Sequence, residues 1–112
     1  MSSSAISIFV GNVTADPTSK PIGNTTLTNF SLAINRPSKG GEEETSFFDF
    51  QAWDGEFSKP ASSIAEHVKK GKTLCIHATP QQDRWDGEDG KGRSKVVFRV
   101  NKWHFVGAKQ ND

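Results

Sequence analysis

The sequence predicts an all-β domain of five strands with one short helix between the third and the fourth strand. Apolar and polar residues alternate with a period of two along five stretches, and turn-forming residues separate these stretches. Only one further stretch has helical spacing. Because the chain has 112 residues, we expect residues 1–112 to form one domain with a single modest core and short flexible ends.

The first strand is expected at residues 5–13. Ile6, Ile8 and Val10 alternate there with other residues and share one apolar face. The following segment, residues 16–24, is dense in proline, glycine, asparagine and serine, and it predicts a loop.

The second strand is expected at residues 25–36. Phe30, Leu32 and Ile34 share one face, and the threonine and phenylalanine content favours a strand over a helix. Residues 37–44 are polar and include three consecutive glutamates, so they predict a solvated loop. Those glutamates would repel a phosphate backbone lying close by.

The third strand, residues 46–54, has two unlike faces. One face is wholly apolar and is expected to be core: Phe48, Phe50 and Ala52. The other carries two aromatic rings, Phe47 and Trp53, separated by polar side chains. An exposed ring costs hydrophobic free energy unless something stacks on it, and unpaired nucleobases are common partners. The alternative is that both rings pack under a loop or against a neighbouring subunit.

One helix is expected at residues 60–70. Ser62 or Ser63 can cap its N-terminus, and Gly71 is a natural stop. Two adjacent lysines, the second of them Lys70, suit the C-terminal end of the helix dipole.

The fourth and fifth strands are expected at residues 73–84 and 94–106. The hairpin loop between them, residues 85–92, contains three glycines, which imply mobility. Pro80 cannot donate a ladder hydrogen bond, so it predicts an edge position or a bulge in the fourth strand. Three strands, one helix and two more strands follow the order of the OB-fold, a five-stranded Greek-key barrel. Such barrels bind oligonucleotides or sugars and also serve as plain interaction modules, so architecture alone does not assign a function.

Composition narrows the function classes. A net charge of +1 argues against coating of duplex DNA through bulk electrostatics and is neutral toward single strands, where stacking contributes. The single cysteine, Cys75, rules out an internal disulfide and fits a reducing compartment. The N-terminal residues show no basic leader, and no stretch approaches the roughly 20 apolar residues of a membrane span. We expect a cytoplasmic, nucleoid-associated protein without membrane contact.

Several motifs, in this order and spacing, resemble one known family. They are Val10-Gly11-Asn12-Val13 with Asp16-Pro17 and Lys20, then N-F-S-L-A-I-N-R ending at Arg36, F-F-D-F-Q-A-W ending at Trp53, V-K-K-G-K ending at Lys72, and Trp85. Residues 6–106 thereby resemble the bacterial single-stranded DNA-binding protein family. The strand that ends at Arg36 is the most specific match.

The resemblance implies sequence-independent binding and protection of single-stranded DNA during replication, recombination and repair, without catalysis, metal or cofactor. Phe47, Trp53 and Trp85 match base-stacking positions of the family, and Arg84 matches a DNA-contacting basic position. Two further residues fall on positions that are often basic and near the nucleic acid: Lys20 and Lys70. The resemblance also implies a homotetramer, with a dimer as the alternative, in which the first strand takes part in subunit contacts.

Other basic residues lie where they could close over a phosphate backbone. Two flank the end of the second strand and three alternate along one arm of the last hairpin: Arg36, Lys39, Lys91, Arg93 and Lys95. The alternative is an ordinary solvated hairpin, and Asp86, Glu88 and Asp89 in the same loop favour it. Trp103 is expected to pack at the barrel surface or at an interface.

The chain departs from the family in four places. It ends at Lys109-Gln110-Asn111-Asp112 where the family carries a long tail with an acidic, hydrophobic tip, so recruitment of repair proteins through such a tip is not expected. Asp83 stands where a basic residue is common, no aromatic follows the second strand, and Asp54 to Ser58 resembles an insertion. We therefore expect weaker binding, or a shorter DNA footprint, than in typical members of the family.

Two other functions are compatible with single features. A tail-less OB-fold protein of the primosomal or scaffold kind would mainly bind protein partners. Cys75 and His77 share a strand face and could ligate a metal in a small enzyme, but a site needs at least one more ligand and none lies nearby in sequence. Walker and G-x-S-x-G motifs are also missing, so we expect no enzyme.

Overall fold

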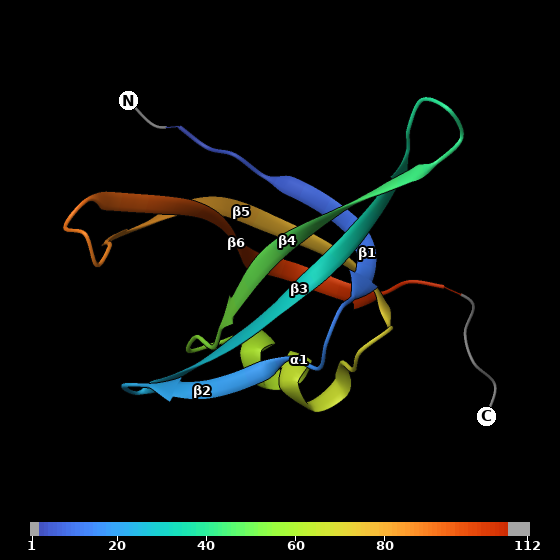
Figure 1. Ribbon diagram of the computed structural model, residues 1–112. Coiled ribbons are helices and arrows are strands. Elements are labelled where there is room, and N and C mark those ends of the chain that lie inside the picture. Colours follow the sequence, from blue (N-terminus) through green and yellow to red (C-terminus); the bar gives the residue numbers. More distant parts are fainter. Residues whose placement is uncertain (1–2, 108–112) are drawn as a thin grey trace.

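In residues 3–107, which the computed structural model describes, six strands and one helix make up the fold (Figure 1). Its elements are β1 (Ser7–Val13), β2 (Thr18–Ile22), β3 (Thr25–Pro37), β4 (Glu43–Trp53), α1 (Pro60–His67), β5 (Thr73–Asp86) and β6 (Gly92–Phe105). The ends that were expected to be flexible, including the expected tail-less end Lys109–Asp112, lie outside the described residues.

Five of the strands close into a barrel in the order β1-β5-β6-β4-β3, and a β1–β3 pairing completes the ring. Neighbouring strands are antiparallel except β4 and β6, which run parallel where Phe50 pairs with Phe98 and Gln51 with Arg99. The short helix lies between the third and the fourth barrel strands. The predicted all-β OB-fold is confirmed.

The ring closes where β1 and β3 approach each other, at the pairing of Asn12 with Ala33. A Cβ atom on Gly11 would lie 2.7 Å from the carbonyl oxygen of Ala33 and would also overlap the side chain of Ile34. Glycine is therefore needed at this position because the backbones approach too closely for a side chain.

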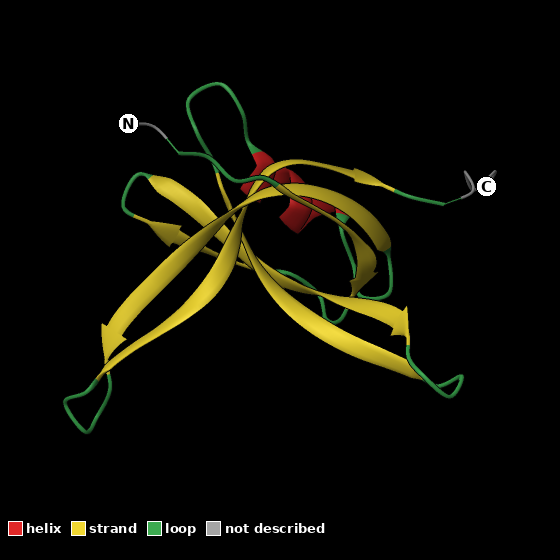
Figure 2. Cartoon of the chain, turned by 90° about the horizontal axis from the view of Figure 1, so that it is seen from above, coloured by secondary structure: helices red, strands yellow, loops and turns green. Residues whose placement is uncertain are grey.

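The core is aromatic at its centre. Phe50 stacks on Phe30 with ring centroids 5.2 Å apart, and Phe9 meets Phe50 edge-on at 5.0 Å. Helix α1 covers one end of the barrel and buries Ala61 and Ile64 in the same cluster (Figures 1 and 2). The predicted inward face of β4 is confirmed at Phe50 and Ala52, which are buried, while Phe48 is partly buried and packs against the cluster.

Two long hairpins, β3–β4 and β5–β6, extend away from the barrel in different directions (Figure 2). The first is longer than predicted, because Pro37 and Glu43 pair with each other and belong to strands. An ion pair of 2.8 Å joins Arg36 to Glu44, and the Thr45 hydroxyl donates to the Asn35 side chain at 2.6 Å. The prediction of a loop over all of residues 37–44 was therefore wrong, since cross-strand pairs extend the ladder.

A second correction concerns residues 18–22, which were predicted as loop and form β2. Within the part of the chain that the structure describes, this strand pairs only with β3, so Pro21 sits on an edge strand, where its missing N–H is tolerated. A two-residue turn, Gly23-Asn24, joins β2 to β3, and Gly23 has a φ of 59°, which favours glycine.

Helix α1 begins at Pro60 as predicted, but its capping and its C-terminal end differ from the prediction. Lys59 is the N-cap residue and makes no side-chain capping bond. Instead, the carboxylate of Asp54 accepts hydrogen bonds from the Ser62 N–H, at 3.1 Å, and from the Ser62 hydroxyl. The helix ends at His67 because Val68 is extended and turns its side chain into the core.

The prediction for Pro80 is confirmed. The β5–β6 register shifts between His77 and Ala78, and the pairing of β1 with β5 ends at Ala78. Pro80 therefore lies just beyond a bulge, on a part of β5 that pairs with β6 alone within the described residues. Among residues 3–107, no helix has the length and apolar character needed to cross a membrane.

Candidate nucleic-acid interface

One outer surface of the barrel runs continuously across β3, β4 and β6. Gln51 marks its middle, because it pairs with Asn29 on one side and with Arg99 on the other, and paired residues share a face. We call this surface the β4 face. It comprises Asn29 and Ser31 of β3, Phe47, Asp49, Gln51 and Trp53 of β4, and Lys95 and Arg99 of β6, with Val97 buried between the last two.

Two aromatic rings lie toward opposite ends of the β4 face. Phe47 is 67% exposed, near the β3–β4 hairpin. Trp53, at the end of β4, is partly exposed, and the guanidinium carbon of Arg99 lies 5.9 Å from the centre of its ring. A cation at this distance is attracted to the face of the ring. The expectation that both rings point away from the core agrees with these positions.

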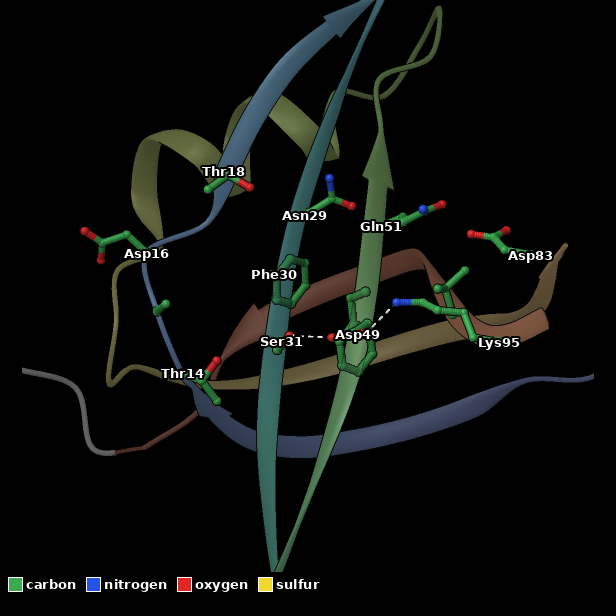
Figure 3. Close-up of a pocket in the computed structure, with 13 residues that line it drawn as sticks. Thr14, Asp16, Thr18, Asn29, Phe30, Ser31, Asp49, Gln51, Asp83 and Lys95 are labelled. Atoms are coloured by element: carbon green, nitrogen blue, oxygen red, sulfur yellow. Dashed lines mark hydrogen bonds and ion pairs between the residues drawn. The ribbon is translucent and has the colours of Figure 1, made fainter. Parts of the chain in front are cut away.

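A groove of about 420 Å³ lies over the middle of the β4 face (Figure 3), and its lining includes Asp49 and Gln51, which stand between Phe47 and Trp53 along β4. Phe30 and Phe50 contribute to its lining from the core side, and Asn29 and Gln51 line it from neighbouring strands. Polar donors and acceptors therefore occupy the space between two flat apolar platforms. Such an arrangement suits a chain of planar groups joined by a polar backbone.

Two of the charged side chains that line the groove, Asp49 and Lys95, are paired with each other. The ammonium of Lys95 lies 2.9 Å from one carboxylate oxygen of Asp49, and the Ser31 hydroxyl donates to the other oxygen at 2.7 Å (Figure 3). The hydrogen bond from Ser31, followed by that from Lys95, holds the pKa of Asp49 below its ordinary value. The carboxylate is therefore ionised at neutral pH and keeps Lys95 beside it.

The third ring, Trp85, is 46% exposed on the β5–β6 hairpin. It pairs with Arg93, two residue pairs away from the Asp83–Lys95 pair and therefore on the same side of this hairpin. Trp85 and Arg93 thus extend the side of the sheet that carries Lys95. Arg93 also forms an ion pair with Asp89 at 3.2 Å.

Other predicted residues lie elsewhere. Arg84 is on the opposite side of the β5–β6 hairpin from Trp85 and donates hydrogen bonds to the Gln82 side chain at 2.7 and 3.2 Å. Arg36 is on the opposite side of the β3–β4 hairpin from Phe47. Each would need to reach a strand around a hairpin edge, so the structure does not bring these two arginines together with the rings.

The predicted lysines other than Lys95 fall into two groups. Lys20 on β2 pairs with Leu27, which in turn pairs with Trp53, so Lys20 is in the same row as that ring. The others are exposed at the margins of the fold, two at the tips of the long hairpins and one in the turn after α1: Lys39, Lys91 and Lys70. The backbone N–H of Lys70 donates a hydrogen bond of 2.8 Å to the carboxylate of Asp16, a lining residue of the groove.

Sequence reasoning missed Arg99 as a site residue. A signal was available, because Lys95 and Arg99 lie four residues apart on one strand and therefore share a face. Only the pairing of β4 with β6, which joins distant parts of the chain, places that face beside Trp53. Trp103 is partly buried, packs against the core, and meets Phe105 edge-on at 5.3 Å.

The residues of the metal hypothesis do not form a cluster. Cys75 is buried, and His77 lies two residues away on β5. Within residues 3–107, no three histidine, cysteine, aspartate or glutamate side chains come close enough together to hold a metal ion.

Comparison with known proteins assigns the family. Residues 5–106 match the family described as "Single-strand binding protein family". The chain belongs to this family. Among relatives in the family, single-stranded DNA-binding protein 1 of Synechocystis sp. is 35% identical over 107 residues, which cover 93% of this chain and 84% of that protein.

Two further relatives show the same pattern. Single-stranded DNA-binding protein 2 of Clostridium acetobutylicum is 37% identical over 109 residues, with 93% of this chain and 79% of the relative covered. Single-stranded DNA-binding protein 3 of Listeria innocua is 33% identical over 108 residues, with 93% of this chain but only 64% of the relative covered. The matched region is therefore a larger share of some family members than of others.

A solved structure confirms the fold of this family member. The structure titled "Plasmodium falciparum SSB complex with ssDNA" superimposes with a TM-score of 0.82 and covers 96% of this chain and 98% of that one. The two sequences are 16% identical, so the likeness concerns the course of the backbone.

Proposed function

We propose that the chain binds single-stranded DNA without sequence preference and protects transient single strands in replication, recombination and repair. The observation that carries this proposal is the β4 face, where an exposed ring, Phe47, and a partly exposed ring, Trp53, flank a polar groove. Family membership supports it, because the relatives named above are single-stranded DNA-binding proteins. We propose a cytoplasmic location, where such DNA is found in a bacterial cell.

The proposed mechanism is passive. Bases splayed from a single strand stack on Phe47 and Trp53, and each stack contributes roughly 1–3 kcal/mol. Arg99 and Lys95 lie on the same face and neutralise phosphates of the strand that follows the groove. The strand then continues toward Trp85 on the hairpin. Every nucleobase has a flat apolar face, so binding of this kind tolerates any sequence. No bond is made or broken, and the protein acts as a binding protein rather than an enzyme.

Titration of fluorescently labelled oligo(dT) tests the proposal. The anisotropy should rise to saturation with the single strand and stay flat with a duplex of equal length. Because counterions are released when phosphates are neutralised, affinity should fall as salt rises from about 50 to 200 mM. Equal binding to duplex and single strand would contradict the proposal, and so would an affinity that is insensitive to salt.

We also propose that the protein is a homotetramer, as the family resemblance implies, with β1 at a subunit contact. Ile8 is 63% exposed, and Ile6 and Val10 on the same face are also exposed. An aliphatic row of this length is unusual on a surface that meets only water. Within the described residues, β1 also pairs with β5 alone from Ser7 to Gly11, which leaves one of its edges open to another strand.

Replacing Ile8 with glutamate should disrupt this assembly, because a charge would be buried against an apolar partner surface. Light scattering coupled to size exclusion should show a four-chain mass for the parent protein and a smaller mass for the variant. Phe57→Glu is the matched control, since Phe57 is an isolated exposed side chain in the loop before α1. A parent protein that runs as a monomer would refute the assembly proposal and leave the DNA-binding proposal intact.

A further inference from the structure

The groove of the β4 face contains a carboxylate, that of Asp49, in the region where the proposed DNA ligand would place its phosphates. Asp49 lies on β4 between Phe47 and Trp53. Its carboxylate forms an ion pair of 2.9 Å with the ammonium of Lys95. Ser31 fixes the second carboxylate oxygen at 2.7 Å. The carboxylate therefore presents two oxygens to donors, as a backbone phosphate does.

The contact between the two charges is exchangeable. The side chain of Lys95 is 49% exposed and that of Asp49 is 53% exposed, so water and ions reach both. Ion pairs exposed to this degree are weak. A phosphate that enters the groove can thus take Lys95 from Asp49 without any rearrangement of the barrel.

We propose that Asp49 is an internal competitor of the DNA phosphate for Lys95, which lowers the affinity for single strands and the salt dependence of binding. The inference rests on the proposed function and adds a residue that sets its strength. In the free protein, Asp49 neutralises Lys95. In the complex, Lys95 moves to a phosphate only by giving up its ion pair with Asp49, and it leaves a carboxylate facing the strand.

Asp49→Asn tests this inference. The amide keeps the size of the side chain and can still accept the hydrogen bond from Ser31, while Lys95 loses its charged partner. At low salt, oligo(dT) should bind about fivefold more tightly, on the scale of one exposed ion pair. The slope of log affinity against log salt should steepen by up to about 0.7 per chain, because one more phosphate is neutralised.

Asp83→Asn is the matched control for charge. Asp83 lines the same groove and pairs with Lys95 across β5 and β6, but it makes no ion pair with it. Its replacement removes the same charge from the groove without freeing Lys95. The gain in affinity should therefore be smaller than for Asp49→Asn.

A double-mutant cycle with Lys95→Gln separates competition for Lys95 from general repulsion between the carboxylates and the DNA phosphates. In the Lys95→Gln background, Asp49→Asn should lose most of its effect, whereas Asp83→Asn should keep its own. If Asp49→Asn binds no more tightly than the parent, or if its gain survives in that background, the inference is overturned. If the parent itself does not bind oligo(dT), the proposed function fails and the inference fails with it. Thermal unfolding of each variant shows whether it is folded.

Discussion

Replacing both Phe47 and Trp53 with alanine is expected to weaken binding of oligo(dT) by at least about tenfold. Each lost stack removes roughly 1–3 kcal/mol, and about 1.4 kcal/mol corresponds to a factor of ten in affinity. Anisotropy titrations of the parent protein and the two single variants, beside the double variant, measure the loss from each ring. The salt slope should change little, because no charge is removed.

Phe105→Ala is the control for this prediction. Phe105 is also an exposed ring, but it pairs with Leu74 near the end of β6 and is not part of the β4 face. Its replacement should leave the affinity for oligo(dT) nearly unchanged. If the Phe47 and Trp53 double variant binds single strands as well as the parent does, the rings are not the platform. The alternative of an OB-fold scaffold that mainly binds proteins would then be favoured.

Replacing Phe50 with alanine is expected to lower the free energy of unfolding by about 3–5 kcal/mol, the range for removal of a buried phenylalanine. Phe50 is 1% exposed and packs against Phe30, Phe9 and Phe98 at ring distances of 5.0–5.7 Å. Its loss leaves a cavity where strands from both halves of the chain meet. Urea denaturation of the variant and the parent at equal protein concentration measures the difference.

The neighbouring ring provides the contrast. Phe47 lies on the same strand but on the outer face, so Phe47→Ala should change the free energy of unfolding by no more than about 0.5 kcal/mol. One variant thus loses stability and the other loses affinity. A Phe50→Ala protein that unfolds at the same urea concentration as the parent would mean that the two faces of β4 are assigned the wrong way round.

The faces of β4 could be read from the sequence because strand periodicity is local. Alternation along residues 46–54 places Phe50 and Ala52 inward and Phe47 and Trp53 outward, as the structure does. The number of barrel strands and their order along the chain also follow from local patterns, since each strand has its own apolar face and its own flanking turns.

Features that depend on long-range contacts could not be read in this way. Residues 18–22 have loop-like composition and become β2 only because the edge of β3 is available to them. The capping role of Asp54 joins residues eight positions apart through a bend that no local pattern specifies. Likewise, the contact between Asp49 and Lys95 spans 46 positions and exists because the barrel closes.

The proposal depends most on base stacking at Trp53, and a protein that retains only this tryptophan tests it most directly. The variant Trp85→Phe with Trp103→Phe leaves Trp53 as the sole tryptophan, since the chain has three. We expect oligo(dT) to quench its fluorescence to saturation, with a midpoint that matches the anisotropy titration and shifts to higher DNA concentration as salt rises. Saturable binding of oligo(dT) with unchanged Trp53 fluorescence would contradict stacking at the β4 face.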